Sequence, residues 1–287
     1  DVVETNTFGA FAVPLGEYQI PERAHELCLA SARIAREVAA GYGGLVAGSM
    51  GPGTKSPSLG QISFADLRDA YEVMARGLLE GGVDLLITET HFDLLAAKAA
   101  VIGARRAMAA TGRDVPLQLQ VTMEQTGTML LGSEIGAALT ALGALRPDVF
   151  GLNCATGPAE MHEHLRHLSA NSPIPISCLP NMGLPSVVDG QMHYDLTPEE
   201  LVEFHTRFIT ELGVRVVGGC CGSSPEHLRQ LAAVAKDLTP APRQARLEDG
   251  ATSMFNAVPL HQDASNLIIG ERTNANGAEK FGDTMLE

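Results

Sequence analysis

The feature that most constrains the fold is the regular alternation of short apolar runs with helical stretches. Most of the apolar runs are nearly continuous, as is typical of strands that are covered on both faces. Strand and helix recur at intervals of about 30–40 residues, the length of one βα unit. The chain is therefore predicted to form a parallel sheet covered by helices. Seven runs are candidate strands: Asp1–Thr5, Leu45–Ser49, Val83–Thr88, Val115–Thr122, Asp148–Asn153, Ile174–Pro180 and Val214–Gly218.

Helix signals lie between these runs. Glu22–Ala40 and Phe64–Glu80 carry apolar residues at helical spacing, and a glycine follows each of them. Thr197 is a predicted N-cap, and Glu200 stands where it would complete a capping box. A helix is therefore predicted from this cap to about Leu212.

Polar residues at the strand ends bear on whether the sheet is open or closed. Side chains that converge from many strand ends are typical of the mouth of a barrel. An open doubly wound sheet is the alternative, but no Gly-x-Gly-x-x-Gly motif follows the first strand. We predict a (β/α)8 TIM barrel that lacks its first strand and helix in this chain, because the first visible strand is under way at Asp1. The polar strand-end residues are Glu4, Ser49, Glu89, Thr122, Asn153, Asn181 and Cys220.

Composition narrows the range of partners. The chain has 287 residues, of which 45% are hydrophobic, enough for one large core. Its net charge of −14 argues against nucleic acid or an anionic membrane surface as a partner. The sequence has no apolar run of membrane-spanning length and no signal-peptide pattern. An odd number of cysteines, five, indicates a reducing compartment, so we expect a cytoplasmic protein.

Three of the cysteines stand at strand ends. Cys154 closes the segment Gly-Leu-Asn-Cys, and the vicinal pair Cys220 and Cys221 follows two glycines after the last strand. Three thiolates from two strand ends could bind zinc and leave its fourth position open, which is typical of catalytic zinc. Burial as small apolar side chains and a disulfide are alternatives that the spacing leaves open. Cys28 and Cys178, within a helix and a strand, are predicted to be buried apolar side chains.

These segments resemble the homocysteine S-methyltransferase family over about residues 1–238. The segments 151–154 and 218–222 are similar to the zinc signature of that family. The resemblance implies a zinc-dependent methyltransferase that converts homocysteine into methionine. Three further segments support it in family order: Glu4-Thr5-Asn6-Thr7-Phe8, Gly48-Ser49-Met50-Gly51-Pro52 and Pro180-Asn181-Met182-Gly183-Leu184-Pro185.

The resemblance also implies a set of metal ligands. Cys154, Cys220 and Cys221 would bind Zn²⁺ as thiolates, and the sulfur of homocysteine would take the open position. A coordinating thiol is deprotonated outright, so zinc would present the substrate as a thiolate at neutral pH. Asn181 would fill the open position through its side-chain oxygen before substrate arrives. The alternative for Asn181 is an ordinary turn residue beside glycine and proline.

Substrate-binding residues follow from the same resemblance. Glu89 matches a family carboxylate that meets the amino group of homocysteine, a charge-assisted contact that selects an amino acid over a simple thiol. Glu4 and Ser49, at neighbouring strand ends, are further candidates. The chain departs from the family pattern in one respect, because it has no counterpart before Asp1 of the Asp-Gly-rich motif that ends the family's first strand.

The C-terminal part of the sequence differs in character from the rest. We expect a barrel over 1–238, a linker rich in proline and charge over 239–266, and the start of a folate-binding domain over 267–287. The last assignment rests on residues 267–274, Leu-Ile-Ile-Gly-Glu-Arg-Thr-Asn, which resemble the opening of the folate-binding barrel in cobalamin-dependent members of the family.

The methyl donor implied by this resemblance is methylcobalamin, bound by another module of a longer protein. The expected partners are then homocysteine and the folate and cobalamin modules of that protein. One alternative is a single-module methyltransferase that uses betaine or S-methylmethionine. An alternative of another class is a non-catalytic barrel with structural zinc or buried thiols.

Overall fold

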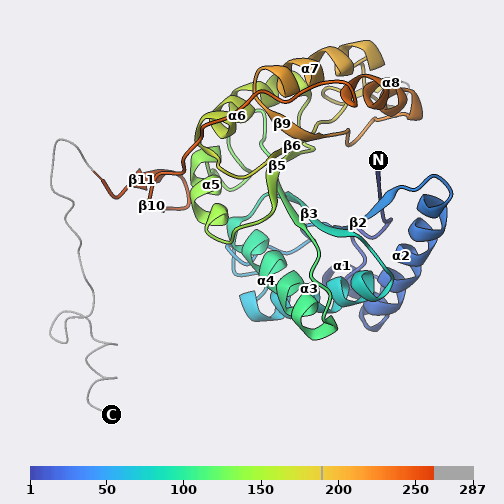
Figure 1. The fold of residues 1–287 in the computed structure, drawn as a ribbon. Helices are drawn as coiled ribbons and strands as arrows, with labels where there is room; N and C mark the ends of the chain where they lie inside the picture. The colour runs from blue at the N-terminus through green and yellow to red at the C-terminus, as the bar shows by residue number, and fades with distance from the viewer. Residues whose placement is uncertain (189, 262–287) are drawn as a thin grey trace, which may run out of the picture.

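A curled parallel sheet forms the centre of the computed structural model, which describes residues 1–188 and 190–261. The sheet confirms the predicted barrel class and forms a half-barrel whose edges are its first and last strands (Figure 1). Along the sheet the order is β1 (Val2–Glu4), β2 (Leu45–Met50), β3 (Leu85–His91), β4 (Leu117–Val121), β5 (Val149–Asn153), β6 (Ile176–Leu179) and β9 (Val214–Val217). Each end of these seven strands lies within three residues of its predicted position.

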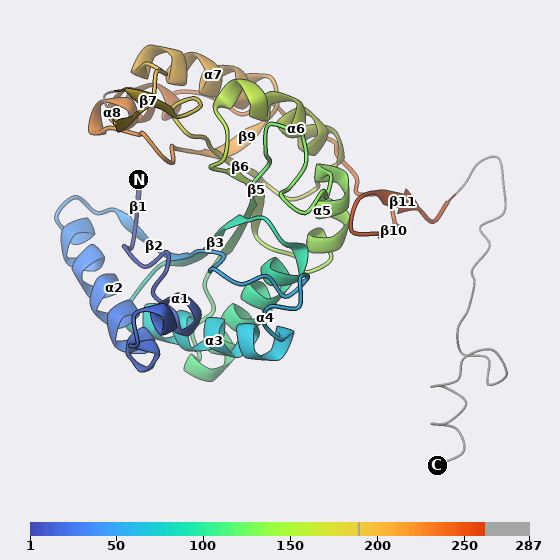
Figure 2. The same ribbon diagram turned by 180° about the vertical axis from the view of Figure 1, so that it is seen from behind.

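Helices cover the convex face of this sheet, as both ribbon views show (Figures 1 and 2). The capping box predicted at Thr197 is present, because its hydroxyl accepts from Glu200 N and the Glu200 carboxylate accepts from Thr197 N. The segment predicted as one helix from Glu22 begins with a 3-10 turn, η1 (Pro21–Arg23). The α-helices are α1 (Ala12–Glu17), α2 (Ala24–Ala40), α3 (Phe64–Glu80), α4 (Leu94–Thr111), α5 (Ile135–Gly143), α6 (Pro158–Asn171), α7 (Pro198–Thr210) and α8 (Pro225–Ala235).

Strand alternation separates an apolar outer face from a polar inner face. Successive side chains of a strand point to opposite sides of the sheet. On β4, Leu117, Leu119 and Val121 belong to the hydrophobic core under the helices, whereas Gln118 and Gln120 do not. Gln120 Nε2 instead donates to Ser177 Oγ of β6 at 3.1 Å, across the intervening strand β5. The inner face is therefore available for polar chemistry.

Small residues let the covering helices approach closely. A Cβ atom at Gly103 of α4 would lie 2.6 Å from Arg68 O of α3. One at Gly77 of α3 would lie 2.6 Å from His25 O of α2. Both distances are shorter than real contacts allow, so glycine sets the spacing of α2, α3 and α4 around the sheet.

Two hairpins lie outside the main sheet. β7 (Ser186–Val188) pairs with β8 (Gln191–His193), and β10 (Gly250–Thr252) pairs with β11 (Ala257–Pro259). The second hairpin lies beside α5, where Glu134 N donates to Phe255 O at 2.9 Å. The sequence patterns predicted neither hairpin.

The first part of the segment expected to be a linker runs along the helical face. Arg243 donates to three backbone carbonyls around the end of α6: Leu168 O, Ser172 O and Ile174 O. Leu247 packs against the hydrophobic core. The predicted opening of a folate-binding domain at 267–287 lies outside the described residues. Within residues 1–188 and 190–261, no helix is long and apolar enough to cross a membrane.

Candidate metal centre at the mouth of the sheet

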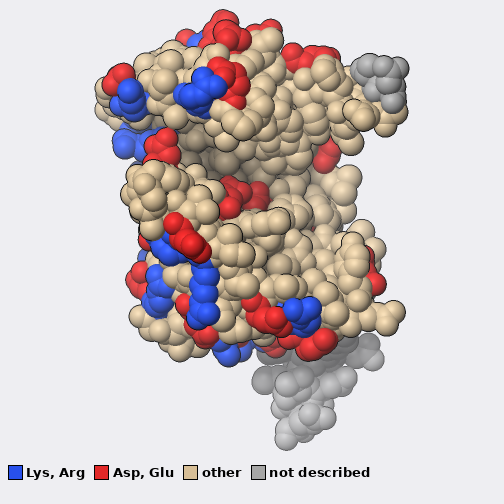
Figure 3. Space-filling view, turned by 90° about the vertical axis from the view of Figure 1, so that its right-hand side faces the viewer, with Lys and Arg blue, Asp and Glu red and all other residues tan. Residues whose placement is uncertain are grey.

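Parallel strands bring their carboxyl ends to one edge of the sheet, and the predicted site residues lie there. By alternation, Glu4, Ser49, Glu89 and Asn153 occupy the inner face of β1, β2, β3 and β5. Ser49, Glu89 and Asn153 are buried. The view into the open side of the curled sheet shows a hollow with acidic side chains on its floor (Figure 3). Ser49 and Asn153 both contact Glu89 through hydrogen bonds.

The structure brings the three strand-end cysteines together. The sulfur atoms of Cys154, Cys220 and Cys221 all lie within 4.8 Å of one another, and the Cys154 and Cys221 sulfurs are 3.6 Å apart. Zinc–sulfur bonds of about 2.3 Å in a tetrahedral arrangement separate two sulfurs by about 3.8 Å. The donor set and its spacing therefore fit zinc, with a fourth position left for another ligand. Cys28 and Cys178 are buried in the core, as predicted.

Backbone hydrogen bonds hold the two cysteine loops to the last residue of β6 and to the loop that follows it. Cys154 N donates to Leu179 O at 3.1 Å, and Cys220 N donates to Pro180 O at 2.7 Å. Cys154 itself has a φ of 59°, in the left-handed region that is uncommon for residues other than glycine. The β6 loop therefore fixes both the Cys154 loop and the Cys220 loop, which sets the distance between their thiols.

Asn181 lies in this same loop. Its side-chain Oδ1 accepts a hydrogen bond from Cys221 N at 3.1 Å, and the side chain is buried. Asn181 N in turn donates to Thr156 O at 3.1 Å. The predicted metal-ligand oxygen is thus beside the thiol cluster and has a backbone partner there.

The three thiols differ in acidity. Hydrogen bonding from the Cys220 thiol, helped by Ala155 N–H, lowers the pKa of Cys154 to about 6. Donating that hydrogen bond, together with burial, raises the pKa of Cys220. Burial also raises the pKa of Cys221. In the core, burial raises the pKa of Cys28 to about 12, so the site thiol Cys154 is far easier to ionise than a core thiol.

The Glu89 carboxylate is held at both oxygen atoms. Ser49 Oγ donates to Glu89 Oε1 at 2.5 Å, and Asn153 Nδ2 donates to Glu89 Oε2 at 3.2 Å. Burial raises the pKa of Glu89, while the Ser49 hydrogen bond opposes that rise. Carboxylate, hydroxyl and amide thus form one network from β2 through β3 to β5.

Glu4 is exposed, unlike Ser49 and Glu89, because it lies on the edge strand β1. Partial desolvation by the surrounding groups, followed by repulsion from Glu89, raises the pKa of Glu4 to about 7. Ser49 bridges to Glu89 and not to Glu4. Two carboxylates with raised pKa values therefore stand close together at the mouth.

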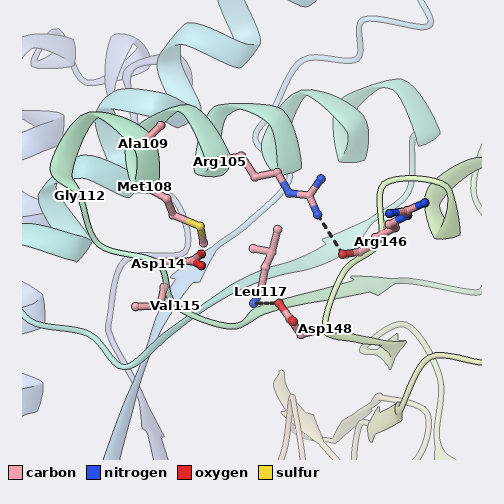
Figure 4. A pocket seen from close by; sticks show the side chains of 9 residues that line it. All are labelled: Arg105, Met108, Ala109, Gly112, Asp114, Val115, Leu117, Arg146 and Asp148. Carbon is pink, nitrogen blue, oxygen red and sulfur yellow. Dashed lines mark hydrogen bonds between the residues drawn. The ribbon is translucent and has the colours of Figure 1, made fainter.

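Two surface hollows lie at opposite ends of the strands. One of about 350 Å³ is lined by Ala155, next to Cys154, and by the loop residues Glu124 and Thr126. The other, of about 570 Å³, lies beyond the C-terminal end of α4 at the start of β4 (Figure 4). In this second hollow Arg105 donates to Arg146 O at 2.9 Å, and none of the predicted site residues lines it. The thiols therefore lie beside the smaller hollow.

Asn153 belongs to the same hydrogen-bond network, although no sequence motif marks it. Its signal in the sequence was weak, since an asparagine before Cys154 reads as the polar end of a strand. Strand alternation places Asn153 on the inner face of the sheet, the face on which Ser49 and Glu89 also lie. Glu89 and Thr90, which it contacts, are more than sixty positions away in the sequence, so a local sequence pattern does not predict these contacts.

A curled parallel α/β sheet with three converging thiols defines a barrel-type protein with a candidate thiolate metal centre. The sequence model of homocysteine S-methyltransferases matches residues 1–235, and the chain belongs to that family. The resemblance carried by the sequence motifs is thereby confirmed.

Two curated relatives cover the whole chain. It is 52% identical to the methionine synthase of Mycobacterium tuberculosis and 49% identical to that of Mycobacterium leprae. The chain spans 24% of the length of each of these proteins. The crystal structure of the metallated form of the homocysteine methyltransferase MmuM from Escherichia coli has the same fold. It is 21% identical, with a TM-score of 0.62 over 81% of this chain and 78% of MmuM.

Proposed function

We propose that this chain is the homocysteine-activating module of a cobalamin-dependent methionine synthase. The observation that carries the proposal is the cluster of Cys154, Cys220 and Cys221 at the strand ends. Family membership and the two methionine synthase relatives support the substrate and the reaction. The same relatives favour methylcobalamin over betaine or S-methylmethionine as donor, since they are about four times longer than this chain and leave room for folate and cobalamin modules. We also assign the reaction to the cytoplasm, where thiols stay reduced.

The three thiolates would hold Zn²⁺ with one position left for the sulfur of homocysteine. Bound zinc keeps a coordinated thiol deprotonated at neutral pH, so the proton of homocysteine leaves to solvent. Methylcobalamin, held by another module of the longer protein, would supply the methyl group to this sulfur. The product methionine, a neutral thioether, would bind the zinc more weakly than the thiolate and could leave.

The remaining side chains orient the substrate. Glu89 would accept a charge-assisted hydrogen bond from the amino group of homocysteine, with Ser49 fixing one of its oxygens. Glu4, two strands away on β1, would place a second acidic group on the same side of the mouth. Asn181 would supply an oxygen ligand while substrate is absent, which requires its hydrogen bond with Cys221 N to break or to be shared.

Metal analysis of the intact protein tests the ligand set. The Cys220→Ala variant should lose its zinc, whereas Cys28→Ala, which removes a core thiol on α2, should retain the wild-type zinc content. Zinc content unchanged in Cys220→Ala would reject the site.

X-ray absorption tests the substrate. Addition of homocysteine should raise the number of sulfur ligands on zinc from about three to about four, with release of a proton at neutral pH. A sulfur count that stays constant would reject homocysteine as the fourth ligand.

A further inference from the structure

We propose that Asn153 is a positioning residue that orients the Glu89 carboxylate and thereby sets the preference of the site for an amino-acid thiol. The inference rests on the proposed function, because it explains how the same site selects homocysteine. Asn153 is the last residue of β5, is almost completely buried, and directly precedes Cys154.

Asn153 first fixes the backbone beside Glu89. Thr90 has a φ of 60°, an outlier for a β-branched residue, and the β3–β4 register shifts between Thr88 and His91. Asn153 Oδ1 accepts from Thr90 N at 2.7 Å, and Asn153 Nδ2 donates to Thr90 Oγ1 at 2.8 Å. Both ends of one amide thus hold the irregular turn of β3 that immediately follows Glu89.

The same amide also contacts the carboxylate itself. Asn153 Nδ2 donates to Glu89 Oε2 at 3.2 Å, while Ser49 holds the other oxygen. A carboxylate fixed at both oxygens cannot rotate freely, yet it keeps further lone pairs for an incoming ammonium group. The direction in which Glu89 faces the mouth is therefore determined jointly by Asn153 and Ser49.

The third contact of this amide reaches the metal centre. Asn153 Nδ2 lies 4.0 Å from Cys220 Sγ, so one side chain spans the distance between the thiol cluster and the carboxylate. The two N–H groups of the amide share three acceptors on Glu89, Thr90 and Cys220. Because the amide is neutral, it links the two groups without adding charge beside the thiolates.

The test compares two thiols that differ only in the amino group. Homocysteine and 4-mercaptobutanoate are titrated into the intact, zinc-loaded protein in wild-type form and in the variants Asn153→Ala, Glu89→Gln and the double variant. The measured quantity is the ratio of their dissociation constants. Asn153→Ala should reduce the preference for homocysteine about tenfold, the size of one hydrogen bond to a charged group, and leave zinc content unchanged. Glu89→Gln should reduce it at least as much.

The double variant identifies the route of the effect. If Asn153 acts through Glu89, the double variant should have the same preference as Glu89→Gln alone. Gln120→Ala is the matched control, because Gln120 is another buried inner-face amide that hydrogen-bonds to Leu152 and Ser177, away from Glu89. It should leave the ratio at the wild-type value.

Asn153→Asp supplies a second variant in case Asn153→Ala does not fold. It retains an acceptor for Thr90 N but removes the donor and adds a charge that repels Glu89, so the preference should fall at least as far. Equal weakening of both thiols, additive losses in the double variant, or zinc loss on changing Asn153 would each overturn the inference. A wild-type protein that binds zinc but not homocysteine would instead refute the proposed function itself.

Discussion

At the scale of single residues, Ser49 affects the ionisation of Glu89 directly through a hydrogen bond. Its hydroxyl donates to Glu89 Oε1 and opposes the effect of burial on the pKa of Glu89. Ser49→Ala should therefore raise the pKa of Glu89 further, since burial would act unopposed. Glu89 would be more often protonated and would bind an ammonium group less well.

We expect Ser49→Ala to weaken homocysteine binding about fivefold to tenfold at pH 7, the contribution of one hydrogen bond. The loss should be larger at pH 6 than at pH 8, because a raised pKa leaves less carboxylate as pH falls. Calorimetric titration at the three pH values measures it. Ser177→Ala removes another buried inner-face hydroxyl and serves as control. A loss that is independent of pH would contradict the ionisation argument.

Residue chemistry explains which parts of the site could be predicted from the sequence. Cysteines at strand ends can be recognised in the sequence although their spacing leaves burial and a disulfide open, and Cys154, Cys220 and Cys221 do converge. The strained turn at Thr90 leaves none, because threonine is a usual strand residue and its φ is set by a partner on β5. Asn153 was visible only as a polar strand end for the same reason.

Among the secondary-structure elements, too, some could be predicted from the sequence and others could not. The cap at Thr197 involves residues three positions apart, and the helix α7 begins as predicted. The hairpin β7–β8 has only three residues in each strand and no alternating apolar pattern, and its strand β8 is exposed throughout. Short pairs of this kind are marginal in isolation, which is why local propensity does not predict them.

The strand β9 and the cysteine loop that follows it are tied to α7 by a histidine. His205 is buried, and its Nε2 donates to Gly218 O at 2.9 Å, so the neutral ring carries its proton on Nε2. Burial lowers the pKa of His205 from 6.5 to about 4. Between these two values the unfolded chain binds a proton that the folded chain does not, and stability therefore rises with pH across this window.

His205 should contribute about 2–3 kcal/mol to the free energy of unfolding above pH 6.5, lost as the pH falls towards 4. The His205→Gln variant retains a donor for Gly218 O but does not titrate. Its denaturant unfolding should depend less steeply on pH than that of the wild-type protein over this window. Parallel pH profiles for the two proteins would show that His205 is not the titrating group.

Arg243 fastens the segment after α8 to the body of the fold. Its guanidinium donates to Leu168 O in the last turn of α6 and to Ser172 O and Ile174 O between α6 and β6. Arg243→Ala should lower the free energy of unfolding by about 1.5–3 kcal/mol, because the carbonyls lose a charged donor. Arg243→Lys should recover only part of this loss, since an ammonium group lacks the planar fork of arginine.

Denaturant unfolding measures both Arg243 variants. Arg207, on the exposed side of α7 and paired with Glu211, gives a matched control, and Arg207→Ala should change stability by less than about 0.5 kcal/mol. Equal effects of Arg243→Ala and Arg207→Ala would mean that the segment is not held by these carbonyls.

At the scale of the whole molecule, the hydrophobic core and the candidate site lie on opposite faces of one sheet. The outer face and its helices contain the hydrophobic core, to which Cys28 and Cys178 belong. The inner face carries the hydroxyl, carboxylate and amide groups, and the three clustered thiols lie at its mouth and outside that core. Folding and the proposed metal binding would therefore depend on different residues, unlike in small zinc domains whose core is the metal site.

This separation predicts what removal of the metal does. Chelation of zinc from the intact protein should abolish homocysteine binding, yet far-UV circular dichroism should keep its helical signal, because the packing of α2, α3 and α4 does not involve the thiols. The thermal midpoint should fall on chelation and recover on adding zinc, since a ligand that binds only the folded state stabilises it. Loss of the helical signal would assign the thiols a structural role, as in the alternative of a scaffold barrel. Homocysteine binding that persists without metal would instead remove zinc from the mechanism and leave Glu89 and its neighbours as the whole of the binding site.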